Sequence, residues 1–145
     1  MADRVIRLPA TFPEFARAAA ELREMLEAHA IGSKSRYNAE LVFEEIVSNV
    51  IRHGCADRVQ CSIEVSLNFR EEAIVMHFQD DGPPFDPRGY ELPAMPRSLE
   101  DARHGGLGLL LVTKASQRIE YEWAKLRNNL TITIALAEAV STATG

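Results

Sequence analysis

The clearest pattern in the chain is a strict alternation of apolar and polar residues near its middle. Apolar residues occupy every second position over 59–69, with polar side chains between them, which predicts a strand with one buried face. After a turn at 70–72, the run 73–80 alternates in the same way and predicts the hairpin partner. Similar alternation at 119–123 and 130–136 predicts a final hairpin.

A helix is predicted near the N-terminus, after a short edge strand at 4–9. Apolar residues recur at three- and four-residue spacing over 12–26. The preceding "TFPE" predicts a capping box, in which Thr11 is the N-cap and Glu14 reaches back to it. Gly32 supplies the stop signal for this helix.

Two more helices are predicted further along the chain. Ser35 is placed to cap a helix over about 36–53, and "GGLGLLLVTKAS" opens a third helix after a proline-rich loop at 81–105. A loop of that length inside a compact domain is usually functional. The order of elements, β-α-α-β-β-loop-α-β-β, predicts an α+β two-layer sandwich. Its mixed, mostly antiparallel sheet is covered on one face by about three helices.

Length and composition narrow the class of protein. The 145 residues suit a single domain over 1–145, and a formal net charge of −5 argues against nucleic-acid binding. The sequence has no apolar run of about 18 residues and no signal peptide, so we expect a cytoplasmic protein without a membrane segment. Cys55 and Cys61 lack histidines at ligand spacing, and we expect neither zinc nor a disulfide framework.

One face of the second predicted helix carries polar groups among apolar neighbours. Glu45, Asn49 and His53 recur at four-residue spacing and therefore share this face. Glutamate and asparagine oxygens suit Mg²⁺, and a glutamate can accept a proton from an attacking hydroxyl. His53, near the helix C-terminus, fits a supporting or capping role better than that of a base. The alternative is a solvated edge of an amphipathic helix.

The sequence "DDGPPFDP" follows a predicted strand. Asp80 continues the apolar alternation of the strand and so points to its buried side. A carboxylate there needs a donor, and the exocyclic amine of adenine in an apolar pocket would be one. The alternative is a turn that Asp80 and Asp81 hold through hydrogen bonds to following amides, with Gly82 shaping it.

A glycine cluster stands where the third helix begins. Gly105, Gly106 and Gly108 leave backbone N–H groups unobstructed at a helix N-terminus, where the helix dipole favours an anion. A tight turn that needs only the backbone freedom of glycine explains the same residues. Taken together, the polar helix face, the acidic turn and the glycine-rich helix start predict an ATP site.

In combination these motifs resemble those of the GHKL ATPase superfamily, whose members share the Bergerat ATP-binding fold. E-x-x-x-N at 45–49 resembles the N box, D-x-G-x-P-F at 80–85 the first glycine box, and G-x-G at 106–108 the second. Thr131 falls where the last box of the fold places a threonine near the adenine. The resemblance covers nearly the whole chain and implies an ATP lid at 86–104.

The resemblance implies a role for each matching residue. Glu45 would act as general base or orient the attacking hydroxyl, Asn49 would ligate Mg²⁺, and Asp80 would read the adenine. The other positions implied to contact the nucleotide are His53, Gly82, Phe85, Arg103, His104, Gly105, Gly106, Leu107, Gly108 and Thr131.

The chain most resembles the small serine/threonine kinases that act as bacterial anti-sigma factors in partner-switching systems. Its length, "SNVIRHG", "DGPPFDP" and the short "GGLGL" carry this likeness. Such kinases bind a sigma factor and phosphorylate a serine of a small antagonist protein. The resemblance therefore implies these two partners, ATP and Mg²⁺ as cofactors, and a homodimer. Relatives often carry an arginine where this chain has His104 beside Arg103, a difference that bears on kinase activity more than on nucleotide binding.

Two other interpretations remain open. An ATP-occupied module could sequester a partner without phosphotransfer. A detached histidine-kinase catalytic domain is less well supported, because that class needs a substrate histidine that is usually followed by an acidic residue. The four histidines of this chain are followed by Ala30, Gly54, Phe78 and Gly105.

Overall fold

The computed structural model describes residues 4–54, 61–89 and 107–136. Its elements are β1 (Arg4–Pro9), α1 (Phe12–Ala28), α2 (Ser33–Asn49), a π-helical turn (Val50–Gly54), β2 (Ser62–Phe69), β3 (Ala73–Asp80), a 3-10 turn (Pro87–Gly89), α4 (Leu107–Ala115), β4 (Arg118–Ala124) and β5 (Arg127–Ala135). The predicted order of strands and helices is confirmed.

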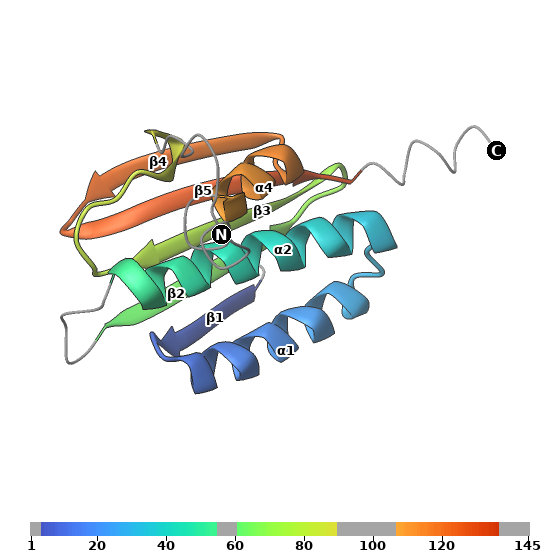
Figure 1. Cartoon of the computed structure of the whole chain (residues 1–145). Coiled ribbons are helices and arrows are strands. Elements are labelled where there is room, and N and C mark those ends of the chain that lie inside the picture. The colour runs from blue at the N-terminus through green and yellow to red at the C-terminus, as the bar shows by residue number, and fades with distance from the viewer. Residues whose placement is uncertain (1–3, 55–60, 90–106, 137–145) are drawn as a thin grey trace.

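The strands form one sheet in the order β1-β2-β3-β5-β4. Every neighbouring pair of these strands is antiparallel, so the sheet is antiparallel throughout the described residues rather than mixed. Helices α1, α2 and α4 lie on the same face of this sheet (Figure 1). The α+β two-layer architecture is therefore confirmed.

The core lies between the sheet and the helices. Alternate side chains of the three central strands face the helices and are buried: Ile63, Val65 and Leu67 of β2, Ile74, Met76 and Phe78 of β3, and Leu130, Ile132 and Ile134 of β5. They join a cluster with buried residues of α1 and α2, among them Leu22, Leu26, Val42, Phe43, Ile46 and Val47. This burial fixes the parity of each strand, that is, which alternate side chains face the helices and which face the other side of the sheet. It therefore also decides which polar side chains face the helices.

The capping box predicted at the start of α1 is wrong. Thr11 is the N-cap, but its side chain makes no capping hydrogen bond. Glu14 instead accepts a hydrogen bond from Arg17 Nε at 2.7 Å. Arg17 also donates from Nη1 to Glu21 at 3.0 Å and from Nη2 to the Arg7 carbonyl of β1 at 2.9 Å. A competing arginine therefore takes the carboxylate that the capping box required.

The boundary between α1 and α2 differs from the prediction. The first helix ends at Ala28, and Ala30 takes the left-handed conformation with φ of 53°. Gly32 is the N-cap of α2, which begins at Ser33. Ser35 does not cap this helix, because its Oγ donates to the Ala135 carbonyl at the end of β5 at 3.2 Å. A tertiary contact thus takes the Ser35 hydroxyl that the local pattern assigned to a helix cap.

The expectation for the cysteines is also wrong in one respect. Cys61 is disulfide-bonded, and Cys55, the second cysteine, lies outside the described residues. Among the described residues, no helix combines the length and apolar character needed to cross a membrane.

Candidate functional site

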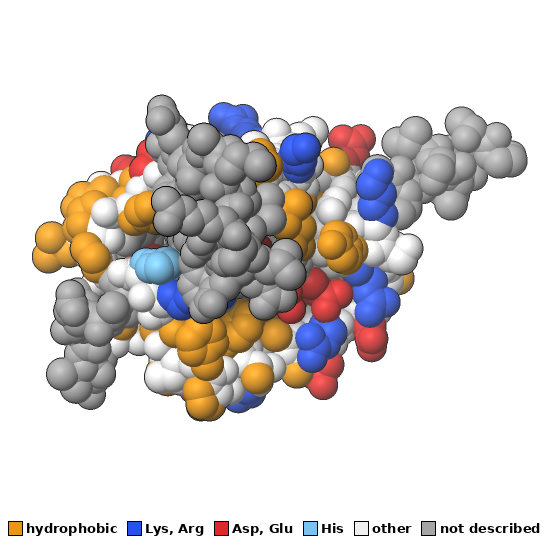
Figure 2. Space-filling view, viewed as in Figure 1, with side chains coloured by type: hydrophobic (Ala, Val, Ile, Leu, Met, Phe, Trp, Pro, Cys, Tyr) orange, Lys and Arg blue, Asp and Glu red, His pale blue; other side chains and the backbone are white. Residues whose placement is uncertain are grey.

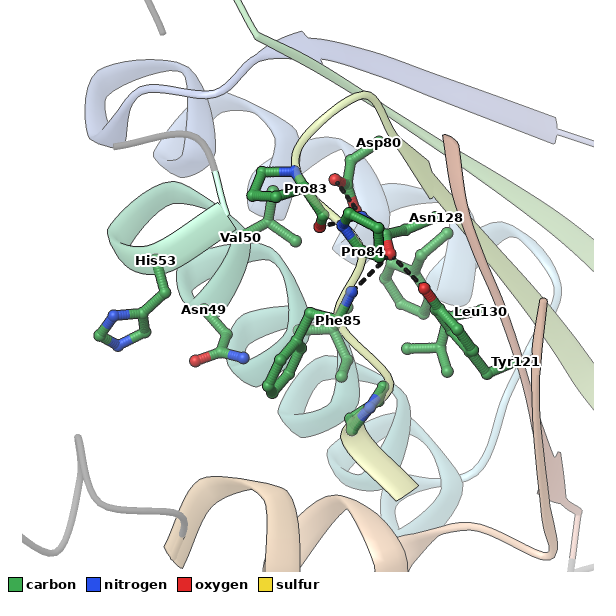
Figure 3. A pocket seen from close by; sticks show the side chains of 13 residues that line it. Asn49, Val50, His53, Asp80, Pro83, Pro84, Phe85, Tyr121, Asn128 and Leu130 are labelled. Atoms are coloured by element: carbon green, nitrogen blue, oxygen red, sulfur yellow. Dashed lines mark hydrogen bonds between the residues drawn. The ribbon is translucent and has the colours of Figure 1, made fainter. Parts of the chain in front are cut away.

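A cavity of about 200 Å³ lies between the C-terminal end of α2 and the adjoining ends of β3, β4 and β5. Figure 3 shows Asn49 and His53 on the helical side of this cavity, with Asp80, Asn128 and Tyr121 on the sheet side. Its walls are mainly apolar and aromatic, from Ile46, Val50, Phe78, Pro83, Pro84, Phe85, Pro87, Tyr121 and Leu130. A few polar groups in an apolar cavity are typical of a small-molecule site.

Asp80 is the buried acid of the cavity, with 8% of its surface exposed. Its Oδ1 accepts from the Gly82 backbone N–H at 2.9 Å and from Asn128 Nδ2 at 3.0 Å. Burial raises the pKa of Asp80 despite these two hydrogen bonds, and the nearby Asp81 charge raises it further. The bond to Gly82 is the turn contact that the sequence allowed as an alternative, so Asp80 both holds the turn and lines the cavity.

The two donors of Asp80 leave its second oxygen available. Within the described residues, both hydrogen bonds to Asp80 end on Oδ1 and none ends on Oδ2. Since no fully buried side-chain oxygen of these residues lacks a partner, Oδ2 is not fully buried. Asp80 Oδ2 is therefore the acceptor that this acid can offer to a ligand in the cavity.

Asn128 is a cavity residue that the sequence analysis missed. It stands opposite Asp80 in the register of β3 and β5 and is buried. Its Nδ2 also donates to the Pro83 carbonyl at 2.9 Å, and its Oδ1 accepts from the Phe85 N–H at 2.9 Å and from the Tyr121 hydroxyl. The signal was present, because Asn128 has the same parity as the buried apolar residues of β5.

Tyr121 is the second residue that was missed. Its ring lines the cavity, and burial raises the pKa of its hydroxyl. The guanidinium carbon of Arg88 lies 5.9 Å from the ring centroid, and Arg88 Nη2 pairs with Asp86 at 2.7 Å. Tyr121 alternates on β4 with the exposed Glu120 and Glu122, so its strand parity also marked it as facing the helices.

The polar face of α2 is partly assembled at the cavity. Asn49 and His53 line it, and a π-helical turn begins directly after Asn49. Such turns occur often at functional sites. Glu45 is not a lining residue of the cavity; its carboxyl group lies against the first turn of α4. A Cβ placed on Gly108 would overlap Glu45 Oε2 and lie 2.8 Å from its Cδ.

The remaining predicted residues fall into three groups. Phe85 lines the cavity, and Gly82 contributes its N–H to Asp80. Leu107 begins α4, with Gly108 buried beside it. Arg103, His104, Gly105 and Gly106 lie outside the described residues, as does most of the lid expected at 86–104.

Thr131 is placed away from the cavity. It alternates on β5 with the buried Leu130 and Ile132, and it lines a different groove together with His77 and Glu120 on the opposite face of the sheet. The side chain that β5 brings to Asp80 is Asn128, three residues earlier.

Charged side chains of both signs occur on the described part of the helical face. Figure 2 shows Lys and Arg side chains interspersed with Asp and Glu on this face.

The family follows from a comparison with known proteins. The sequence model of the histidine kinase-like ATPase domain matches residues 8–140. The chain belongs to this family. The match includes every described residue that lines the cavity.

Individual members of similar sequence and fold are also known. This histidine kinase-like ATPase domain is 28% identical over 101 residues to the serine/threonine-protein kinase BtrW of Bordetella bronchiseptica, covering 70% of this chain and 71% of BtrW. The RsbU and RsbW domains of Rv1364c from Mycobacterium tuberculosis match with a TM-score of 0.61 and 16% identity, over 92% of this chain and 32% of that chain. A chain of the SiaB–SiaC complex from Pseudomonas aeruginosa matches with a TM-score of 0.57 and 16% identity, over 92% and 90% of the two chains. These two structures share the fold.

Proposed function

We propose that this protein binds ATP with Mg²⁺ and is a serine/threonine protein kinase. In the proposed role it acts as an anti-sigma factor of a partner-switching system and phosphorylates a serine of a small antagonist protein. The observation that carries the proposal is the buried Asp80, whose second oxygen is available at an apolar cavity. Membership of the ATPase family and similarity to BtrW support it.

The cavity suits the adenine base rather than a whole nucleotide. Its volume of about 200 Å³ is below the range of about 300–1,000 Å³ of pockets that enclose a drug-sized ligand. Asp80 Oδ2 would accept from the exocyclic amine, and the aromatic and proline walls would pack on the faces of the base. The ribose and phosphates would then extend out of the cavity, with Asn49 and His53 on its helical side.

Binding of the Mg²⁺ ion would depend on the bound nucleotide. Among the described residues, no group of three or more His, Cys, Asp or Glu side chains could hold an ion. The Asn49 amide oxygen would be a protein ligand, and phosphates and waters would complete the coordination. A bound Mg²⁺ ion would neutralise negative charge on the phosphates.

Glu45 is the proposed catalytic residue. Its carboxyl group lies against Gly108 in the first turn of α4, where backbone N–H groups and the helix dipole favour phosphate. Glu45 would accept the proton of the attacking serine hydroxyl or orient that hydroxyl. We also propose nucleotide contacts for Gly82, Phe85, Arg103, His104, Gly105, Gly106, Leu107 and Gly108. A lid at 86–104 within a single domain over 1–145, and a homodimer, are parts of the same proposal.

A phosphotransfer assay tests the kinase. The protein is incubated with Mg-ATP and a small antagonist protein of the partner-switching type, and phosphoserine on the antagonist is measured by mass spectrometry. Glu45→Gln should lose transfer while retaining ATP binding, because the amide cannot accept the proton. Glu44→Gln is the matched control, since Glu44 is the exposed neighbour on α2.

The second candidate is an ATP-bound module that sequesters a partner without phosphotransfer. It is favoured by His104 in place of the arginine that relatives often carry. Partner binding that depends on ATP, with no phosphoserine formed by the wild type, would support this candidate. Absence of ATP binding in the wild type would reject both.

A further inference from the structure

The Asn128 side chain joins four parts of the cavity wall. It contacts Asp80 at the end of β3, the carbonyl of Pro83 in the following turn, the backbone N–H of Phe85, and the hydroxyl of Tyr121 on β4 (Figure 3). We propose that Asn128 is a positioning residue that orients Asp80 and thereby sets the base selectivity of the cavity. This inference rests on the proposed nucleotide binding.

The surroundings of Asn128 fix the orientation of its amide. Its Oδ1 faces two donors, the Phe85 N–H and the Tyr121 hydroxyl, while its Nδ2 faces the Asp80 carboxyl and the Pro83 carbonyl. A flipped amide would set its oxygen against those two acceptors and its NH₂ group against the Phe85 N–H. The network therefore allows one orientation, in which a donor always points at Asp80 Oδ1.

That donor determines which Asp80 oxygen is offered to a ligand. Oδ1 is held by Asn128 and by the Gly82 N–H, so Oδ2 is the free acceptor. A base with an amine at the matching position can donate to Oδ2, whereas a base with a carbonyl there would place two acceptors together. The cavity should thus prefer adenine to guanine as long as Asp80 is ionised and held in this orientation.

The charge state of Asp80 depends on the same contact. The hydrogen bond from Asn128 lowers the pKa of Asp80, and burial together with the Asp81 charge raises it. Among the described residues, the other titratable groups that line the cavity are Tyr121 from β4 and His53 from the π-helical turn after α2. Because both groups are unchanged in Asn128→Asp and in Asn129→Asp, a difference between the pH profiles of these two variants reports the Asn128 contact.

An isosteric substitution can distinguish the role of the Asn128 amide nitrogen from the role of its oxygen. In Asn128→Asp, one oxygen can still accept from Phe85 and Tyr121, but the group facing Asp80 becomes a second carboxyl oxygen. The neighbouring Asn129→Asp is the matched control, because it makes the same change on the same strand. Asn129 faces the other side of the sheet, where its Oδ1 accepts from Gln79 at 2.9 Å.

The experiment measures ATP and GTP affinity by titration calorimetry from pH 5 to pH 8 for the wild type and both variants. We expect Asn128→Asp to weaken the ATP-over-GTP preference by roughly tenfold, the scale of a lost hydrogen bond to a charged group. The loss of ATP binding at low pH should also move to higher pH, because two adjacent carboxyl groups cannot both ionise readily. Asn129→Asp should match the wild type in both measurements.

Four results would count against the inference or its basis. An unchanged preference and pH profile in Asn128→Asp, or equal changes in Asn129→Asp, would reject the role of Asn128 while leaving ATP binding intact. A wild type that binds no ATP would instead reject the proposed function.

If Asn128→Asp fails to fold, Tyr121→Phe provides the test, since it removes one donor to Asn128 Oδ1. It should lower the ATP-over-GTP preference without moving the pH profile, and an unchanged preference would count against the inference.

Discussion

Asp80 and Asn128 face one another across β3 and β5, and the Asn128 amide donates to Asp80 Oδ1 at 3.0 Å. Both residues stand where a run of buried apolar side chains ends in a polar one. The pairing lets a carboxyl group stay inside the protein, because a buried acid needs donors. It also places the buried acid of the cavity, whose pKa is raised by burial, next to the turn that forms one wall of the cavity.

Asp80→Asn should separate ligand binding from stability. The folded-state pKa of Asp80 is raised, so the native state holds this proton at pH values where the unfolded state has released it. Stability therefore falls as pH rises from the ordinary aspartate pKa to the raised one, and the loss persists at neutral pH. Removing the charge should leave the melting temperature at pH 7 unchanged or higher.

The same variant should lose ATP affinity by roughly tenfold to a hundredfold, as expected for a hydrogen bond to a charged group. Titration calorimetry measures the affinity, and thermal unfolding without nucleotide measures the stability. Glu71→Gln is the control, since Glu71 is an exposed acid in the turn between β2 and β3 and does not line the cavity. A lower melting temperature for Asp80→Asn would mean that the buried charge stabilises the fold, contrary to the raised pKa.

Asn49→Ala should remove the dependence of ATP binding on Mg²⁺. The amide oxygen is the proposed protein ligand of the ion, and the described residues offer no cluster of acids or histidines to replace it. Affinity for ATP measured with excess EDTA should change little. Calorimetry with and without Mg²⁺ measures how much the ion increases ATP affinity. An Asn49→Ala variant that keeps the full increase would show that Asn49 is not the ligand.

Gly108→Ala should reduce phosphotransfer without destabilising the fold. The new Cβ would overlap Glu45 Oε2, and the carboxyl group can swing away at small cost because it is the end of a flexible side chain. Displacing a catalytic group by about 1 Å can cost roughly a hundredfold in rate. Phosphoserine formation under single-turnover conditions and the melting temperature are the two measurements.

Lys114→Ala, an exposed position on the same helix, is the control for Gly108→Ala. If Gly108→Ala transfers phosphate at the wild-type rate, then the position of Glu45 against α4 does not matter for catalysis.

The β4–β5 turn should accept a stabilising substitution. Lys125 and Leu126 both have positive φ, 55° and 61°, in the two-residue loop between the paired Ala124 and Arg127. Such loops favour Asn-Gly, and each left-handed residue with a Cβ costs about 1 kcal/mol or more. Lys125→Asn with Leu126→Gly should raise the free energy of unfolding by about 1–2 kcal/mol in urea denaturation.

No core contact is lost in that double variant, because Leu126 is 78% exposed. Leu126→Ala alone keeps a Cβ at positive φ and should give no gain. An equal gain from this single change would mean that removing the exposed leucine, rather than relieving the backbone, is what stabilises the protein.

Strand positions followed from the sequence because side-chain parity is a local property. The alternation at 73–80 predicted that Asp80 shares a face with buried residues, and the structure agrees. The same parity on β5 selects Asn128 and excludes Thr131 from the helical face. Motif resemblance alone points to Thr131, whereas the alternation along its strand sets it on the side opposite to Leu130 and Ile132.

Features that depend on distant residues could not be predicted locally. The hydroxyl of Ser35 suited a helix cap, but the end of β5 supplies a carbonyl for it. Glu14 suited a capping box, but Arg17 takes its carboxylate. The approach of Glu45 to Gly108 depends on how α4 packs on α2, which no spacing along the chain encodes.

The contact between Arg17 and the Arg7 carbonyl affects whether a strand of another molecule can pair with the edge of the sheet. β1 is an edge strand, and unpaired main-chain groups on an edge invite a strand from another molecule. Here a guanidinium steadied by Glu14 and Glu21 already occupies one of the acceptors. An incoming strand would have to displace Arg17 before bonding to the Arg7 carbonyl, so we expect this contact with α1 to disfavour edge-to-edge association at β1.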